Sequence, residues 1–341
     1  MSLGLHDFDF ELPERLIAQY PSHPRDHAKL LVYDRITQTI QDSFFYELDN
    51  LLSPNTTLVL NNSRVEKCRL LFEEGKIEVF VLEIIDPYCV QALVRPGKKF
   101  KVGKIISLAP GLQAQVISIS EDGLRTLRLS HTFDDAIFEP FKHTPLPPYI
   151  AQNDALSEEY QTIYAKYEGS KAAPTAGLHF TAELMQRIAK RGVSIEELTL
   201  HVGMGTFAPV KTERIKDHII HEEDYILTEQ VASRLAKARH ITAVGTTSVR
   251  VLESVVLMNS INGSQVQRKF NTGSGSTDIF ITPGYRYQAV DALITNFHLP
   301  KSTLLMLVAA FVGLEEMHRI YAHAIASEYR FYSFGDAMLL R

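Results

Sequence analysis

Ile241-Thr-Ala-Val-Gly-Thr-Thr-Ser-Val-Arg250 joins an apolar run to a turn crowded with hydroxyl groups, and a helix-forming run follows it. The same pattern recurs where 292–294 runs into 295–302, and where 197–200 runs into 201–206. In open α/β sheets, ligands bind in the crevice outside the carboxyl ends of the strands. Polar side chains gathered at several strand ends therefore predict an enzyme or a small-molecule binding protein.

The order of strand-like and helix-like segments along the chain predicts two kinds of domain. From 64 to 149, short β-type runs follow one another between Gly- and Pro-containing turns, which is typical of a small antiparallel barrel or sandwich. After residue 150, helices and strands alternate, which indicates a mainly parallel sheet covered by helices. We therefore predict an α/β domain made of 1–63 and 150–341, with an all-β, barrel-like domain inserted at 64–149.

Local signals refine the second part of the chain. Thr181, Thr228 and Ser302 are expected to be the N-caps of three helices, because each hydroxyl precedes a helix-forming run. The glycines around 273 predict a loop, followed by a strand at 278–281.

Composition bounds the class of protein. The 341 residues are 45% hydrophobic and 22% charged, as in a folded globular chain. Acidic residues stand where a signal peptide needs positive ones, and the apolar run at 304–314 is too short to span a bilayer. Cys68 and Cys89 lack partners at metal-binding spacing and suit a reducing compartment. We expect a cytoplasmic monomer that does not enter membranes.

One segment departs from the net charge of −5. Within 95–104 there are five positive side chains and no acid: Arg95, Lys98, Lys99, Lys101 and Lys104. A local basic surface of this kind is what an acidic protein needs to meet a polyanion, and the alternative is a solvated basic hairpin.

The turn at 245–250 has the composition of an anion site. Free N–H groups at the helix start, with the hydroxyls of Thr246, Thr247 and Ser248, suit a carboxylate or a phosphate. Gly245 and Arg250 complete the candidate set. The alternative is an N-cap with hydroxyls to spare, although one hydroxyl is enough for capping.

Three histidines lie in turns that could carry acid–base chemistry. His298 follows Thr295 and Asn296 at a strand end, and a polar loop with a solvated histidine is the alternative. His179 ends a run of small residues that lets a ligand approach the backbone, and His201 precedes a glycine-containing turn.

The segment His218-Ile-Ile-His221-Glu-Glu223 offers a metal-site alternative. On a helix, histidines three residues apart can bind zinc, whereas on a strand they face opposite sides. No other metal signal accompanies them. A metal-dependent hydrolase built on His218, His221 and Glu223 is the competing hypothesis, and we predict no metal site.

With these segments laid out, the chain resembles the S-adenosylmethionine:tRNA ribosyltransferase-isomerase family of queuosine biosynthesis nearly end to end. The resemblance is carried above all by Ala172-Ala-Pro-Thr-Ala-Gly-Leu-His-Phe-Thr181, Leu200-His-Val-Gly-Met-Gly-Thr-Phe207, Val244-Gly-Thr-Thr-Ser-Val-Arg250 and Val290-Asp-Ala-Leu-Ile-Thr-Asn-Phe-His-Leu-Pro-Lys-Ser302. The sequence departs from the family pattern at Asn61-Asn-Ser-Arg64, where Asn-Asp-Thr-Arg is expected.

The resemblance implies a reaction and its substrates. The ribosyl part of S-adenosylmethionine would pass to 7-aminomethyl-7-deazaguanine at the wobble position of tRNA, giving epoxyqueuosine, adenine and methionine. S-adenosylmethionine would be a substrate, and no true cofactor is expected. Such chemistry needs a base for a C5′ hydrogen and an acid for adenine, and a neutral imidazole suits either task.

The expected site residues follow from this chemistry. The catalytic candidates are His179, His201 and His298, with the carboxylates Asp278, Asp291 and Glu223. The donor-binding candidates are Gly245, Thr246, Thr247, Ser248, Arg250, Thr295 and Asn296. The candidates for tRNA binding are Arg95, Lys98, Lys99, Lys101 and Lys104.

Overall fold

The computed structural model describes residues 3–203, 210, 212–261 and 265–341, and it describes the backbone alone at 259–261 and 265–267. The chain forms two compact units. The larger consists of Met1–Arg64, Pro147–Ala151 and Glu158–Arg341, and the smaller of Val65–Leu146 and Gln152–Ser157. The chain therefore crosses between the units more than once near residues 147–157.

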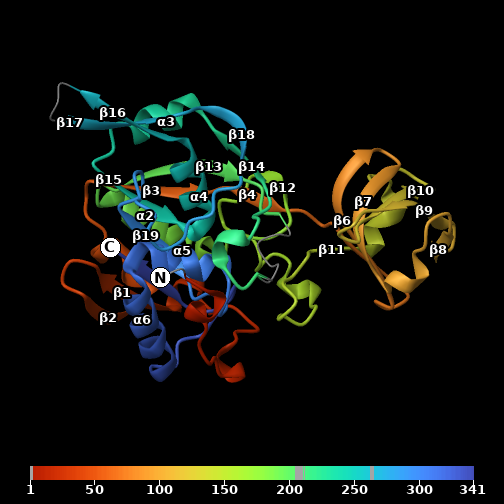
Figure 1. The fold of residues 1–341 in the computed structure, drawn as a ribbon, viewed down its shortest axis with the longest axis horizontal. Coiled ribbons are helices and arrows are strands. Elements are labelled where there is room, and N and C mark those ends of the chain that lie inside the picture. The colour runs from red at the N-terminus through yellow and green to blue at the C-terminus, as the bar shows by residue number, and fades with distance from the viewer. Residues whose placement is uncertain (1–2, 204–209, 211, 262–264) are drawn as a thin grey trace. The chain divides into compact units, whose positions relative to one another are not determined.

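Among the described residues, the larger unit is built on one nine-stranded sheet (Figure 1). The strand order is β18 (Gly273–Thr277), β14 (Glu223–Leu227), β13 (Ser194–Leu200), β3 (Thr56–Asn61), β15 (His240–Val244), β19 (Ala292–Asn296), β20 (Ala337–Leu340), β1 (Lys29–Asp34) and β2 (Thr39–Phe44).

The sheet is mixed, which corrects the expectation of a mainly parallel one. Its centre, β13–β3–β15–β19, is parallel throughout, and β20 is parallel to β1. The remaining neighbours, β18–β14, β14–β13, β19–β20 and β1–β2, are antiparallel. The strand–helix alternation that predicts parallel pairing holds at the centre of the sheet. By contrast, β1 and β2 form a hairpin, and β19 reaches β20 through two successive helices, Thr303–Val312 and Leu314–Ala326.

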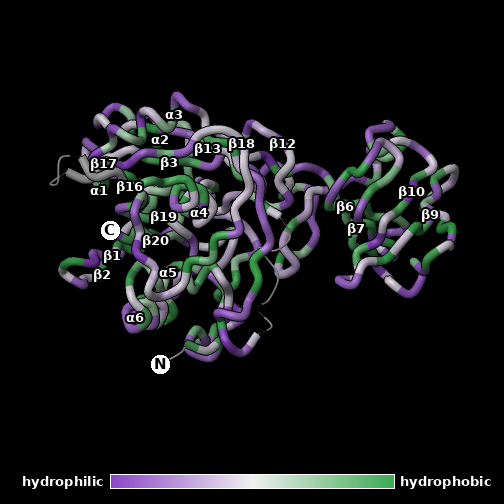
Figure 2. Tube along the Cα trace, turned by 45° about the horizontal axis from the view of Figure 1, so that its top comes forward, coloured by the Kyte–Doolittle hydropathy of each residue, from purple (hydrophilic) through white to green (hydrophobic). Residues whose placement is uncertain are grey.

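Helices cover both faces of the sheet centre. Leu58 and Leu60 pack in one hydrophobic cluster with α2 (Ala182–Lys190), while Val59 between them packs in another with α4 (Gly245–Val255) and α5 (Thr303–Val312). Strands buried on both faces read as continuous apolar runs, as 241–244 and 292–294 do. The trace of α5 is hydrophobic along most of its length (Figure 2). The other helices of this unit are α1 (Leu48–Leu51), α3 (Glu229–Leu235) and α6 (Leu314–Ala326).

The predicted helix starts are confirmed. The hydroxyls of Thr181, Thr228 and Ser302 accept hydrogen bonds from the N–H groups of Leu184, Val231 and Leu305, at 3.2, 3.3 and 3.2 Å. The strand expected at 278–281 is wrong. The strand is instead β18, at Gly273–Thr277, where glycines pair with β14 on the sheet edge. A two-stranded ribbon, β16 (Val256–Ile261) and β17 (Gln265–Phe270), precedes it.

The smaller unit holds one antiparallel sheet of seven strands in its described residues. Their order is β11 (Lys142–His143), β5 (Arg69–Phe72), β6 (Ile77–Asp86), β7 (Cys89–Arg95), β10 (Arg125–Leu129), β9 (Leu112–Ile119) and β8 (Ile105–Ala109). The sheet curls around its own core of buried residues, with register shifts in the β6–β7, β10–β9 and β8–β9 pairs. Its end strands do not pair with each other, so it is a half-barrel and not a closed one.

No helix in the described part of the chain is both long and apolar enough to cross a membrane.

Candidate active site

A pocket opens in the larger unit where the parallel strands end. It encloses about 700 Å³ of space between atoms, part of which is open to solvent. The strand ends contribute Thr295 and Asn296 at the end of β19, His298 just after it, and Gly245 to Thr247 after β15. The turn at 172–176 and the pair Tyr332–Ser333 complete the wall. The predicted meeting of strand ends is therefore present, because β15 and β19 run parallel.

The first turn of α4 presents unsatisfied donors to this pocket. The N-cap residue Val244 provides no side-chain acceptor, so in the described part of the chain the first N–H groups of this helix have no side-chain cap. Gly245 has φ +83°, a conformation that favours glycine. Thr247 is only 9% exposed, and its Oγ1 has no hydrogen-bond partner among the described residues. A buried donor that is left unpaired costs free energy, so this turn is built to receive an acceptor.

Two of the predicted donor-binding residues lie outside the pocket wall. Ser248 donates its hydroxyl to the carbonyl of Val244 at 2.8 Å, so it closes the helix turn behind the site. Arg250 points into a second cavity, where it forms a buried ion pair with Glu223 and donates to the carbonyl of Thr277 at 3.2 Å. The carboxylate of Glu223 also accepts from the N–H of Gly203 at 2.9 Å.

The end of β19 carries a chain of polar contacts. Asn296 is buried, and its Nδ2 lies 3.1 Å from Nε2 of His179. Its Oδ1 accepts from the hydroxyl of Thr175 at 3.0 Å. Thr175 lines the pocket and His179 does not. The structure therefore places His179 behind Asn296, and Thr175 in front of it.

His298 lines the pocket directly. Its Nε2 lies 2.9 Å from Oγ1 of buried Thr295, and its backbone N–H donates to the hydroxyl of Tyr321 at 3.0 Å. Burial lowers the pKa of His298 to about 3. The imidazole is therefore neutral at pH 7, able to accept a proton but with none stored to give.

An aromatic pair forms another part of the wall. The rings of Tyr149 and Tyr332 lie 4.7 Å apart between centroids, and Tyr149 hydrogen-bonds to Ser333 at 2.7 Å. Tyr332 has φ +73°, an uncommon conformation for a bulky residue. Sequence reasoning missed Tyr149, Tyr332 and Ser333, because no local pattern marks them. It predicted a small-residue turn at 173–178 but did not single out Thr175.

The remaining predicted catalytic residues do not line the pocket. His201 packs against Gly169, and its Nδ1 has no partner among the described residues. Burial lowers the pKa of His201, while Asp224 opposes the shift. Its neighbour Val202 does line the pocket. Asp278 is exposed beyond the end of β18. Residues 204–209 of the predicted glycine turn lie outside the described residues.

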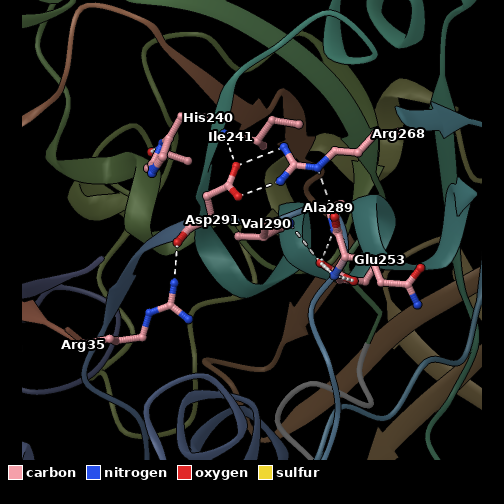
Figure 3. A network of polar contacts seen from close by, with 10 residues as sticks. Arg35, His240, Ile241, Glu253, Arg268, Ala289, Val290 and Asp291 are labelled. Carbon is pink, nitrogen blue, oxygen red and sulfur yellow. Dashed lines mark hydrogen bonds and ion pairs between the residues drawn. The ribbon is translucent and has the colours of Figure 1, made fainter. Parts of the chain in front are cut away.

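Asp291 stands at the opposite end of β19 from the pocket. Its carboxylate pairs with Arg268 through contacts of 2.6 and 3.0 Å, and it accepts from the N–H of Ile241 at 2.7 Å (Figure 3). Arg35 donates to its backbone carbonyl at 2.7 Å. Asp291 therefore ties the start of β19 to the start of β15 and takes no part in the pocket.

The second cavity contains the residues of the metal alternative. His218, His221, Glu223 and Arg250 line it, with an apolar wall that includes Phe280. Glu223 is committed to Arg250 and to the N–H of Gly203. In the described parts of the chain, no group of three or more His, Cys, Asp or Glu side chains is arranged to hold a metal ion. The described residues thus do not supply the ligand set that the hydrolase hypothesis requires.

The buried His179 predicts how stability depends on pH. Burial and the nearby Arg330 and Arg25 lower its pKa to about 3, whereas an unfolded histidine titrates near 6.5. Below pH 6.5 the histidine takes up a proton in the unfolded chain but stays neutral in the folded protein, so the free energy of unfolding falls as pH falls. At pH 5 this amounts to about 2 kcal/mol. Urea unfolding at pH 7.5 and 5.0 measures this loss. Between these two pH values, the free energy of unfolding of His179→Gln should fall by about 2 kcal/mol less than that of wild type. Equal pH dependence in both would contradict this account of His179.

Comparisons with known proteins agree with the resemblance. The family model described as "Queuosine biosynthesis protein" matches residues 5–340. The S-adenosylmethionine:tRNA ribosyltransferase-isomerase of Desulfitobacterium hafniense is 46% identical over 349 residues, covering 99% of this chain and 100% of the relative. The protein of the same name from Clostridium kluyveri is 45% identical over 346 residues, covering 98% of this chain and 99% of that relative.

A solved structure is also similar. The crystal structure of S-adenosylmethionine tRNA ribosyltransferase from Thermotoga maritima matches with 38% identity and a TM-score of 0.55. The match covers 98% of this chain and 100% of that one. The predicted family is confirmed: the chain belongs to the queuosine biosynthesis protein family.

Proposed function

We propose that the protein is an S-adenosylmethionine:tRNA ribosyltransferase-isomerase. It transfers and isomerises the ribosyl moiety of S-adenosylmethionine onto 7-aminomethyl-7-deazaguanine at the tRNA wobble position, giving epoxyqueuosine-tRNA, adenine and methionine. The observation that carries this proposal is the 46% identity, over 99% of the chain, to a relative of that name. Because the proposed substrate is tRNA, we also propose that the protein acts in the cytoplasm.

The pocket offers a place for each end of S-adenosylmethionine. The methionine carboxylate suits the first turn of α4, where N–H groups converge and the helix dipole favours negative charge. The Thr247 hydroxyl, which has no partner among the described residues, lies at the same turn. The adenine ring suits the wall made by Tyr149 and Tyr332, because a flat apolar base gains by contact with aromatic faces. This arrangement keeps the donor within one pocket of the larger unit.

His298 is our candidate for the base that takes the C5′ hydrogen. The positive sulfonium acidifies the hydrogens on the adjacent carbon, and the neutral imidazole of His298 can accept one of them. Its contact with Thr295 holds the ring in one orientation at the end of β19. Adenine leaves more readily once it is protonated, and a low-pKa histidine cannot supply that proton from its resting state.

The smaller unit carries the surface proposed for tRNA. Arg95 and Lys99 are exposed but face the carboxylates of Glu78 and Glu73, at 2.7 and 3.8 Å. Lys98, Lys101 and Lys104 form no ion pair among the described residues. These three lysines are therefore the better phosphate partners.

Replacing those three lysines by alanine tests this surface. Each phosphate contact that is lost should lower the slope of log affinity against log salt by roughly 0.7–0.9. The triple variant should bind tRNA more weakly with a slope about 2–3 smaller, while its affinity for S-adenosylmethionine stays constant. Filter binding at several salt concentrations measures this, with Lys99→Ala, whose lysine already faces a carboxylate, as the matched control. An unchanged slope would move the tRNA contact elsewhere.

The function itself is tested by incubating the protein with S-adenosylmethionine and tRNA that carries 7-aminomethyl-7-deazaguanine. Adenine and methionine should be released in equal amounts, and only when that tRNA is present. Release that needs no modified tRNA would contradict the proposal. So would activity that a chelator abolishes and zinc restores, which would favour the hydrolase alternative.

A further inference from the structure

The amide of Asn296 can be oriented from its neighbours alone. Its Nδ2 lies 3.2 Å from the carbonyl oxygen of Tyr332 and 3.5 Å from that of Asp336. Carbonyl oxygens only accept hydrogen bonds, so the NH₂ group must face them, and the amide oxygen must face the opposite way. The orientation of this side chain is thereby fixed by the backbone of 332–336.

The same NH₂ group decides the tautomer of His179. It lies 3.1 Å from Nε2 of that histidine, and an NH₂ group can only donate to it. Nε2 must then be the unprotonated nitrogen, and the proton of the neutral ring resides on Nδ1. Burial, which lowers the pKa of His179 to about 3, keeps the ring neutral.

The orientation of the Asn296 amide also decides where the Thr175 hydroxyl donates its proton. Since the amide oxygen of Asn296 faces Thr175, at 3.0 Å, the single hydroxyl proton of Thr175 is donated there. Only lone pairs remain on the Thr175 oxygen. Thr175 is part of the pocket wall, so it offers the ligand an acceptor and no donor.

We propose that Thr175 recognises the α-ammonium group of the methionine end of S-adenosylmethionine, with Asn296 and His179 as positioning residues. The inference rests on the proposed function. A Cβ built on Gly245 would lie 3.9 Å from Cβ of Ala176 and 3.4 Å from Oγ1 of Thr247, so the turn that holds Thr175 borders the start of α4. An α-amino acid carries both charged groups on one carbon. A carboxylate held by that helix start thus brings the ammonium toward the neighbouring acceptor.

Calorimetry with two probes tests the inference: S-adenosyl-L-homocysteine, and its analogue that lacks the α-amino group. A hydrogen bond to a charged group corresponds to about 10–150-fold in affinity, so wild type should prefer the first probe by that factor. Thr175→Val should abolish the preference by weakening the first probe alone. Thr175→Ser, which keeps the hydroxyl, should retain it, as should the strand control Thr126→Val in the smaller unit.

The outcomes separate this inference from the proposed function. Failure of wild type to bind either probe would overturn both. Binding of both probes by wild type, with the same preference in Thr175→Val, would overturn the inference and leave the function standing.

A second readout addresses the positioning residues. Nitrogen-15 NMR of labelled protein should show His179 as the neutral Nδ1–H tautomer at pH 7. A proton on Nε2 would overturn the proposed positioning of Thr175 by His179 and Asn296. His179→Gln keeps an acceptor at this place and should retain the probe preference, whereas His179→Leu should reduce it.

Discussion

Replacement of His298 by alanine is expected to lower the turnover number by about 10²–10⁴, the usual contribution of a positioned acid or base. His298 is the one predicted catalytic histidine that lines the described pocket, and its ring is held by Thr295 at 2.9 Å. S-adenosylmethionine should still bind, because its carboxylate is assigned to the start of α4. Single-turnover release of adenine measures the rate, and calorimetry measures the binding.

Two controls define this result. Nε2 of His323 lies 2.9 Å from a carboxylate oxygen of Asp42, and His323 does not line the pocket. His323→Ala should therefore keep the wild-type rate. Because burial lowers the pKa of His298, a base at this position stays active as pH falls well below 6.5, and kcat/KM should remain flat from pH 7.5 to about 5. Full turnover in His298→Ala would remove this residue from the chemistry.

Replacement of Glu253 by alanine is expected to lower the free energy of unfolding by about 3–5 kcal/mol. The buried carboxylate accepts from the N–H groups of Ala289 and Val290 at 3.0 Å (Figure 3). It also accepts from the N–H of Gln288 at 2.9 and 3.3 Å and from the hydroxyl of Tyr285 at 3.0 Å. Alanine would leave these donors buried without a partner. Glu253 thereby holds the segment that enters β19, the strand whose far end carries Asn296 and His298.

Urea unfolding at pH 7.5 measures the loss, and the exposed Glu11→Ala is the matched control, expected within about 0.5 kcal/mol of wild type. The free energy of unfolding of Glu253→Gln should lie between those of Glu253→Ala and wild type, because the glutamine keeps one acceptor oxygen. A Glu253→Ala variant as stable as wild type would show that water replaces the carboxylate without cost.

The sequence predicted the pocket where local signals and topology coincide. Apolar runs at 241–244 and 292–294 are parallel neighbours in the sheet, so the polar residues after them had to meet at one edge. Helix caps at Thr181, Thr228 and Ser302 were readable because capping depends on a few adjacent residues.

The sequence could not decide side-chain direction or distant partners. Arg250 lies on the helix that starts the anion site, yet its partner is Glu223, on a strand reached only through the fold. Asp291 and His298 are close in the sequence, but a strand separates them, so they lie at opposite ends of β19. Tyr149 and Ser333 meet across 184 positions, and no local pattern announces such a contact. The antiparallel pairs β18–β14 and β19–β20 were hidden for the same reason, because the paired strands lie far apart in the sequence.

The most direct test of the account is a crystal structure of the protein with S-adenosylmethionine bound. We predict the methionine carboxylate at the first N–H groups of α4 beside Thr247, the ammonium on Thr175, adenine against Tyr149 and Tyr332, and C5′ facing His298. Donor bound instead in the second cavity, between His218 and Arg250, would contradict the assignment of the active site.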